Sequence, residues 1–197
     1  MSKTQSIIKL IVMDKTYRTE RSRIFLIEEL PEPLTRAAAH IQFFDNYITE
    51  TRLRLRSIRD PESKEWTYIM QQRLPVNADL PAERKISDIY LNEAEHAHFE
   101  QFEGNEIRKN RYFHEFDGRM FSFDVYLGKL WGLNTALVEF DDDEDPFAVD
   151  MPSFAVYEVT GKPFFSGENL VNMKFDDIQA EVAELFEITA EPNTATE

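Results

Sequence analysis

Arginine alternates with leucine in the stretch TRLRLRSI, so the charged side chains recur at every second position. In a β-strand this period places Arg52, Arg54 and Arg56 on one face and the leucines on the other. Neighbouring arginines on one face stand about 7 Å apart, and at an effective dielectric constant of about 20 each pair repels by roughly 2.4 kcal/mol. Water and salt remove most of this repulsion on an open surface, whereas an enclosed space needs anions to offset it. The pattern therefore indicates either a sheet with a solvated charged face or a closed barrel with a charged lumen.

Other segments show the same alternation, with both signs of charge. Lys109 and Arg111 share a face in IRKNRYF. Asp124, Glu139 and Glu158 occupy alternating positions in FSFDVYLG, ALVEF and YEVT. Basic and acidic strands that face one another in one lumen would form a consistent site, in which arginines hold phosphates and carboxylates hold a divalent cation.

Most of the chain has the pattern of short strands separated by turn residues. The expected strands are 19–27, 40–48, 51–58, 66–73, 85–91, 107–115, 120–127, 134–140 and 155–160. The dipeptide Asp117-Gly118 predicts a tight hairpin between the sixth and seventh of these. The fold class predicted from this pattern is α+β, with one domain dominated by an antiparallel sheet.

Two segments predict helices. Asn92 precedes EAEHAHFEQF and Glu95 follows three residues later, which is a variant of the capping box. DIQAEVAELF, near the end of the chain, has apolar residues at helical spacing. The last ten residues, ITAEPNTATE, have no apolar period and predict a flexible tail.

Composition excludes several classes of function. Lys and Arg number 22 against 37 Asp and Glu, which gives a net charge of −15 and argues against duplex nucleic acid or an anionic membrane as partner. The absence of cysteine excludes disulfides, thiolate metal sites and a cysteine nucleophile. The apolar run near the start is too short to span a membrane and no targeting segment is evident, so we expect a cytoplasmic protein.

Six motifs in order resemble the CYTH family, also called the triphosphate tunnel metalloenzymes. They are TERSRIFLI, TRLRLR, IRKNRY, FDVYLGKLWGL, ALVEF and EVTGK, and together they cover about residues 18–170. The resemblance implies an antiparallel eight-stranded β-barrel, or tunnel, with a few flanking helices. The domain organisation expected from it is an N-terminal extension at 1–17, a tunnel domain at 18–175, a helix at 176–187 and a tail at 188–197.

The resemblance also implies a function, namely metal-dependent hydrolysis of a triphosphate. The expected ligand is inorganic triphosphate, another triphosphate-containing small molecule or polyphosphate, and the expected cofactor is Mg²⁺ or Mn²⁺. The phosphate-binding positions implied are Arg52, Arg54, Arg56, Arg73, Lys109 and Arg111. The metal-binding positions implied are Glu20, Asp124, Glu139 and Glu158.

The sequence departs from the family pattern at several of its functional positions. Ser22 replaces the second glutamate of the opening motif and Ile24 replaces its lysine, so no catalytic residue is assigned. The lysine of the fourth strand has no match, although Arg73 follows nearby. Leu137 stands where the family has a glutamate, and Phe164 and Lys162 replace an arginine and an aspartate after EVT.

Three interpretations remain open from the sequence. The first is a triphosphatase that uses the residues above. The second is a tunnel protein that binds a polyanion or phosphometabolite without hydrolysing it, which the departures favour. The third is an acidic domain with protein partners, in which the alternating charges, such as Arg54, are simply solvated.

Overall fold

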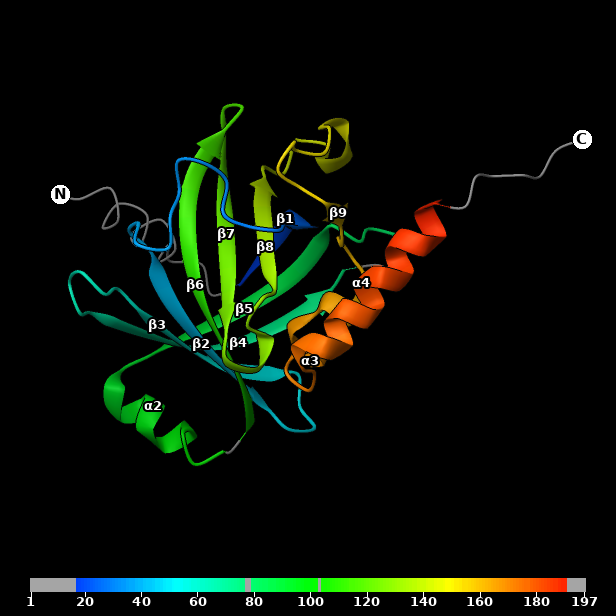
Figure 1. Cartoon of the computed structure of the whole chain (residues 1–197). Coiled ribbons are helices and arrows are strands. Elements are labelled where there is room, and N and C mark those ends of the chain that lie inside the picture. Colours follow the sequence, from blue (N-terminus) through cyan, green and yellow to red (C-terminus); the bar gives the residue numbers. More distant parts are fainter. Residues whose placement is uncertain (1–16, 77–78, 103, 191–197) are drawn as a thin grey trace, which may run out of the picture.

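Eight antiparallel strands form a closed barrel (Figure 1). The computed structural model describes residues 17–76, 79–102 and 104–190. The strands follow the order β5-β4-β3-β2-β6-β7-β8-β1, and pairing of β5 with β1 closes the barrel. Their bounds are β1 Tyr17–Leu26, β2 Ile41–Ile48, β3 Leu53–Arg59, β4 Trp66–Pro75, β5 Glu83–Leu91, β6 Gly104–Phe116, β7 Arg119–Leu127 and β8 Asn134–Phe140. The predicted antiparallel eight-stranded barrel is confirmed.

The ninth predicted strand is much shorter than expected. Only β9 (Tyr157–Glu158) forms within the segment 155–160. It pairs with the last residues of β1, where Phe25 lies opposite Glu158. Strand β5 pairs only with the first half of β1, so the same edge of β1 is unpaired in its second half and accepts the short strand β9. The barrel is complete without it.

The predicted hairpin joins β6 to β7 through Asp117 and Gly118. Both residues have positive φ, at 50° and 75°, which is the backbone conformation that a two-residue turn of this kind requires. Pairing then runs without interruption from Phe116 opposite Arg119 to Arg108 opposite Leu127. The turn thus fixes which side chains of these two long strands face the lumen.

Both predicted helices form. Helix α2 (Glu93–Phe99) has the capping box: Oδ1 of Asn92 accepts a hydrogen bond from the Glu95 backbone at 2.9 Å, and Glu95 accepts one from the Asn92 backbone at 2.8 Å. Helix α4 spans Phe175–Ala190 and so continues beyond the predicted end at 187. The predicted N-terminal extension up to residue 16 and the tail from 191 onward lie outside the described residues.

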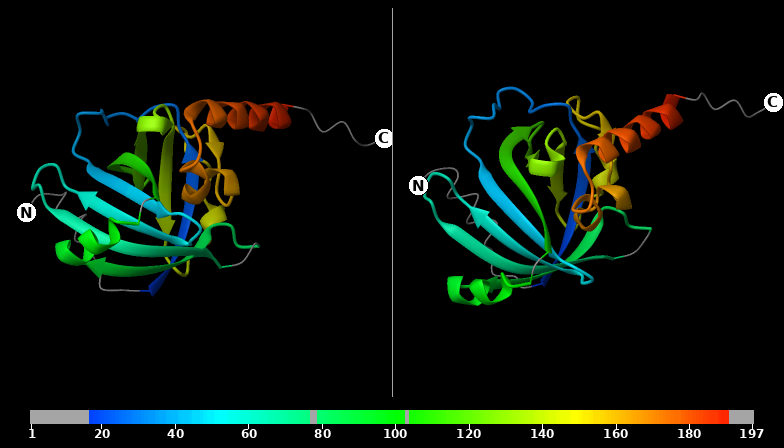
Figure 2. Two further views of the ribbon diagram at one scale, coloured as in Figure 1. Left: turned by 90° about the horizontal axis from the view of Figure 1, so that it is seen from below. Right: turned by 60° about the horizontal axis from the view of Figure 1, so that its bottom comes forward.

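The sequence did not predict four short elements. The 3₁₀ turn η1 (Gly128–Leu130) lies between β7 and β8, and η2 (Pro146–Ala148) lies between β8 and β9. The 3₁₀ turn η3 (Pro163–Phe165) and helix α3 (Gly167–Leu170) lead from β9 to α4. Both views of Figure 2 show α3 and α4 on the same side of the barrel, next to β1. Of the helices that the structure describes, none combines the length and apolar character needed to cross a bilayer.

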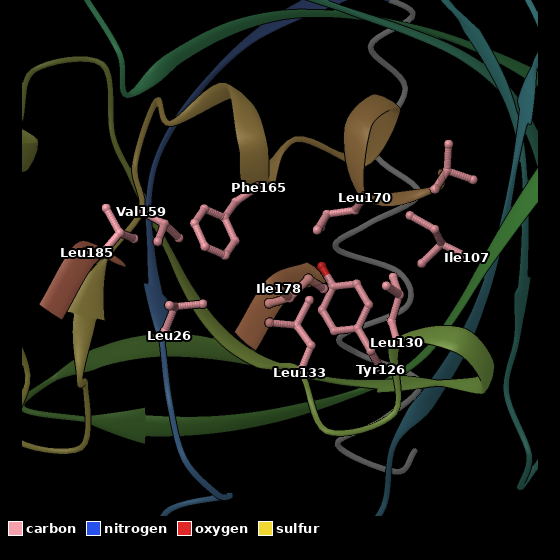
Figure 3. Close-up of a cluster of buried hydrophobic side chains, with 11 residues drawn as sticks. Leu26, Ile107, Tyr126, Leu130, Leu133, Val159, Phe165, Leu170, Ile178 and Leu185 are labelled. Carbon is pink, nitrogen blue, oxygen red and sulfur yellow. The ribbon is translucent and has the colours of Figure 1, made fainter. Parts of the chain in front are cut away.

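The apolar core is divided between the outside of the barrel and its ends. Outward-facing residues of β1, β7 and β8 pack against the connecting segments that cover them. A second cluster, which we call the mouth cluster, closes one end of the lumen, and Figure 3 shows its members. Here Phe165 of η3, Leu170 of α3 and Ile178 of α4 pack with barrel residues. The barrel strands contribute Leu26, Ile107 and Tyr126, and the connection between β7 and β8 contributes Leu130 and Leu133.

Candidate functional site

Charged and polar side chains gather inside the barrel. The alternation of each strand turns every second residue inward, and the inward positions at mid-barrel are polar on seven of the eight strands. This lumen set consists of Arg18, Glu20, Asp45, Arg54, Arg56, Gln71, Arg73, Asp88, Lys109, Arg111 and Asp124. The structure thus places cationic and anionic side chains together inside the closed barrel, which is the second of the two arrangements that the alternation left open.

Asp45 of β2 lies between two arginines of β3. Its carboxylate accepts hydrogen bonds from Arg56 at 2.6 and 2.7 Å and from Nη1 of Arg54 at 3.2 Å. Arg54 also donates to Gln71, whose amide donates to Asp88 at 2.6 Å. Burial acts to raise the pKa of Asp45, but the two arginines outweigh it and hold this pKa well below its usual range. The carboxylate is therefore ionised at neutral pH.

Asp124 of β7 is bound in the same way by two cations of β6. Nζ of Lys109 lies 2.6 Å from Oδ2, and Arg111 binds both oxygens at 2.6 and 2.7 Å. Burial acts to raise the pKa of Asp124, yet Arg111 and Lys109 lower it to about 2. Burial also lowers the pKa of Lys109 to about 8, because Asp124 only partly offsets the loss of hydration.

Glu20 of β1 forms the third such group. It accepts a hydrogen bond from Nη2 of Arg73, and Arg18 lies 3.3 Å from its other oxygen. Burial opposes ionisation of Glu20, but Arg73 and Arg18 together lower its pKa to about 2. Three lumen carboxylates are thus each shared by two cations.

Glu139 of β8 differs from these carboxylates. It lies opposite Ser22 on β1 and shares its face of the strand with Leu137, and its side chain reaches solvent. Its carboxylate makes no hydrogen bond or ion pair with the part of the chain that the structure describes. Loss of hydration, and after it the charge of Glu20, raises its pKa. Glu139 is therefore the inward carboxylate that is easiest to protonate.

The predicted phosphate-binding residues are brought together with one exception. Arg54, Arg56, Arg73, Lys109 and Arg111 all lie in the lumen, with Arg54 only 6% exposed, so the interpretation of a solvated arginine row is wrong for β3. Arg52 lies instead in the turn before β3 and is exposed at the rim. The strand begins at Leu53, so the alternation that the sequence suggested does not extend to Arg52.

The predicted metal-binding residues do not converge. Glu20 and Asp124 are in the lumen but each is bound by two cations, and Glu139 lies nearby. Glu158 is on β9, where Arg23 binds its two oxygens at 2.9 and 2.7 Å. Arg23 faces away from the lumen, because it alternates with the inward residues of β1. Glu158 therefore does not join the other three.

These donors do not fit a metal held by the protein itself. Mg²⁺ and Mn²⁺ take oxygen ligands, and carboxylates that already neutralise two guanidinium or ammonium groups are poor donors. No group of three or more His, Asp or Glu side chains with metal-binding geometry occurs among residues 17–76, 79–102 and 104–190. We therefore derive no chemical step through a resident metal.

Two of the departures from the family pattern are neighbours in the structure. Ile24 lies directly opposite Leu137 in the pairing of β1 with β8. Ile24 packs against the mouth cluster, and Leu137 is 9% exposed. Where the resemblance implies a lysine and a glutamate side by side, this barrel has an apolar pair. The lumen at this level can neither donate nor accept a proton through these two side chains.

Four lumen residues were missed by the sequence analysis: Arg18, Asp45, Gln71 and Asp88. Asp45 lies on the same face of β2 as Phe43 and Tyr47, so it is a single charge in a row of aromatic side chains and shows no charge alternation of the kind seen in β3. Gln71 and Asp88 stand among other polar residues, such as Gln72 on β4 and Ser87 on β5, and no alternation sets them apart. Their role becomes evident only when β4 and β5 are placed beside β3.

Comparisons with known proteins support the fold. No family model matches the chain, and no curated protein matches its sequence. Among solved structures, the inorganic triphosphatase NE1496 is 22% identical, with a TM-score of 0.53 over 78% of this chain and 95% of that chain. A second structure, described as the hypothetical protein NE1496, gives a TM-score of 0.54 over 79% of this chain and 99% of that one. The chain therefore has a CYTH-like tunnel fold, the fold of the inorganic triphosphatase NE1496.

Proposed function

We propose that the lumen binds the triphosphate group of a small molecule, or a short polyphosphate, and holds it without hydrolysing it. The observation that carries this proposal is the arrangement of three cation pairs in one enclosed space. The pairs are Arg54 with Arg56, Lys109 with Arg111, and Arg18 with Arg73, and each pair shares one carboxylate. Guanidinium groups bind phosphate oxygens in the same forked geometry as carboxylate oxygens.

The proposed binding is an exchange of anions. Phosphate oxygens take the place of Asp45, Asp124 and Glu20 on the same cations, which stay in position. The cost of ordering the arginine side chains is already met in the unliganded protein, which favours binding. The chain as a whole has a net charge of −15, so attraction of a polyanion depends on this local positive field.

The absence of hydrolysis is inferred from the apolar pair. Ile24 and Leu137 cannot stabilise developing charge or transfer a proton, and the carboxylates nearby are bound by cations. Of the predicted metal ligands in the lumen, Glu139 makes no contact with a cation in the described chain.

Hydrolysis assisted by Mg²⁺ or Mn²⁺ is the second candidate, and the position of Glu139 favours it. Glu139 and Glu20 are close enough for the charge of one to raise the pKa of the other. Mg²⁺ commonly takes one or two protein carboxylates, with phosphate and water completing its shell. One of the solved structures that this chain resembles is an inorganic triphosphatase, which makes inorganic triphosphate the first ligand to test.

Titration calorimetry with inorganic triphosphate, with and without Mg²⁺ or Mn²⁺, tests the proposal, and a phosphate-release assay follows on the same samples. We expect saturable binding and a raised melting temperature with no phosphate released. If the purified protein releases phosphate and Glu139→Gln does not, the function is the second candidate, metal-assisted hydrolysis. If triphosphate, pyrophosphate and polyphosphate all fail to bind, both assignments are wrong.

A further inference from the structure

Helix α3 lies over one mouth of the lumen and is fixed there at two points. Leu170 and Val171 are buried in the mouth cluster. At the other end of the helix Gly167 packs against Tyr47 of β2, and a methyl group on Gly167 would lie 1.7 Å from the Tyr47 hydroxyl oxygen. That hydroxyl accepts a hydrogen bond from Nη1 of Arg54 at 2.9 Å. The helix is thus in contact, through one side chain, with the cations of the lumen.

A small opening remains between α3 and the ends of β3 and β4. Its volume is about 10 Å³, the space of about one water molecule. Its lining combines three arginines with one carboxylate: Tyr47, Thr51, Arg52, Leu53, Arg54, Arg73 and Glu168. This space is too small for a phosphate group, so a phosphate chain that projects from the lumen at this mouth has to widen it and then lies between the arginines and Glu168.

Glu168 is exposed at this opening and its charge reaches into the lumen. Burial acts to lower the pKa of Arg54. The charges of Asp45 and Tyr47 outweigh this effect and raise the pKa, and the charge of Glu168 raises it further. The same carboxylate also acts on Arg84. Burial and the charge of Arg73 lower the pKa of Arg84, and the charge of Glu168 acts to raise it. No hydrogen bond joins the Glu168 carboxylate to a residue in the described part of the chain. The carboxylate is thus free to meet whatever emerges from the mouth.

We propose that Glu168 limits the length of the polyphosphate that the lumen holds. This inference rests on the proposed binding of triphosphate. A triphosphate group among the three cation pairs keeps its charges within the lumen. A longer chain has to place the next phosphate beside the carboxylate of Glu168, and like charges at that distance oppose binding. Glu168 is on this view a specificity-determining residue, which selects triphosphate over long-chain polyphosphate.

The experiment compares inorganic triphosphate with long-chain polyphosphate by titration calorimetry, in low salt and in about 0.15 M salt. Glu168→Gln removes the charge and keeps the size of the side chain. We expect it to raise the affinity for long-chain polyphosphate at least tenfold and to change the affinity for triphosphate less than twofold. Glu184→Gln, on the exposed side of α4, removes the same charge elsewhere and controls for the net charge of the chain.

A second variant tests the same mouth by shape instead of charge. Gly167→Ala forces the Tyr47 hydroxyl or α3 to move and so widens the opening. We expect it to raise the affinity for long-chain polyphosphate as well. Equal gains for both ligands in Glu168→Gln, or the same gain in Glu184→Gln, would overturn the length limit while leaving triphosphate binding intact. A wild-type protein that binds neither ligand overturns the proposed function, and the length limit with it.

Discussion

Arg111 of β6 binds both carboxylate oxygens of Asp124 on β7, with Nε 2.6 Å from Oδ1 and Nη2 2.7 Å from Oδ2. The two residues are direct cross-strand partners, so their backbones fix the distance between them. Lys109 shares the same carboxylate at 2.6 Å. The cations of the lumen are therefore held in position by the protein's own anions, and a ligand meets a site that is already ordered.

Replacing Asp124 by Asn tests whether these shared carboxylates hold the lumen together. The amide cannot neutralise Lys109 and Arg111, which stay buried, so we expect the free energy of unfolding to fall by about 3–5 kcal/mol. Added triphosphate should recover more of this loss in Asp124→Asn than it adds to the wild type. Urea unfolding with and without ligand measures both effects. Asp143→Asn, in an exposed loop, should stay within about 0.5 kcal/mol of the parent, and an equal loss there would contradict the interpretation.

Replacing Arg54 tests the binding role of the lumen arginines. Arg54→Ala should weaken triphosphate binding at least tenfold, or about 1.4 kcal/mol, because it removes a guanidinium from one of the three cation pairs. Arg108→Ala is the matched control, since Arg108 is an exposed arginine of β6 that pairs with Glu106. Arg54→Lys should retain part of the affinity, because the charge stays but the fork is lost. Calorimetry on folded variants, checked by circular dichroism, measures the affinities, and equal losses in Arg54→Ala and Arg108→Ala would contradict the assignment.

Acid should destabilise the barrel in a defined pH range. The pKa of Glu20 falls from 4.5 to about 2, and that of Asp124 from 3.8 to about 2, so the folded chain keeps both ionised where the unfolded chain takes up protons. Their stabilisation is complete above about pH 5 and is lost as the pH falls toward about 2. Glu139, with its raised pKa, acts in the opposite direction but is one group against Glu20, Asp124 and also Asp45, whose pKa is lowered as well. Unfolding free energies measured from pH 7 to 2 should fall steeply in the wild type and less so in Asp124→Asn.

How much of this was predictable from the sequence depends on the range of the interactions. Alternation along one strand is local, so the sequence showed that Arg54 and Arg56 share one face of β3, but it did not show that this face points inward. The tight turn at Gly118 and the cap at Asn92 were equally local and are confirmed. The closed eight-stranded barrel came from the resemblance, and the order of the strands around it was not predicted, since pairing between distant strands leaves no pattern in one sequence.

The residues that the sequence analysis misplaced lie where regular alternation ends. Arg52 precedes the first paired residue of β3 and so is exposed at the rim. Glu158 lies in a strand of two residues, too short for alternation to indicate a face, and Arg23 binds it outside the lumen. Asp45 and Asp88 act through partners on other strands, Arg56 and Gln71. Tertiary contacts decide such positions, and no local pattern carries them.

Alkaline pH should weaken anion binding through Lys109. Burial lowers its pKa from 10.5 to about 8, so it loses its positive charge as the pH rises through that value. Between pH 8 and 10.5 the unfolded chain keeps the proton that the folded chain has released, and the free energy of unfolding rises with pH over this range. Triphosphate affinity should fall from pH 7 to 9.5 while this contribution to stability grows. Lys109→Arg keeps its charge throughout and should bind with little change, whereas a parallel fall in that variant would exclude Lys109 as the cause.

A variant of Glu158 tests whether this residue has the structural role found here or the metal-binding role that the resemblance implied. Its carboxylate pairs with Arg23, which is 5% exposed and donates to the backbone oxygens of Pro146 and Val149 as well. Glu158→Gln should therefore lower the free energy of unfolding by about 1–3 kcal/mol, the cost of weakening a charged hydrogen bond at a buried group. It should leave triphosphate affinity unchanged, with or without Mg²⁺, because the side chain lies outside the lumen. A loss of Mg²⁺-dependent binding in Glu158→Gln, at unchanged stability, would return Glu158 to the metal-binding set.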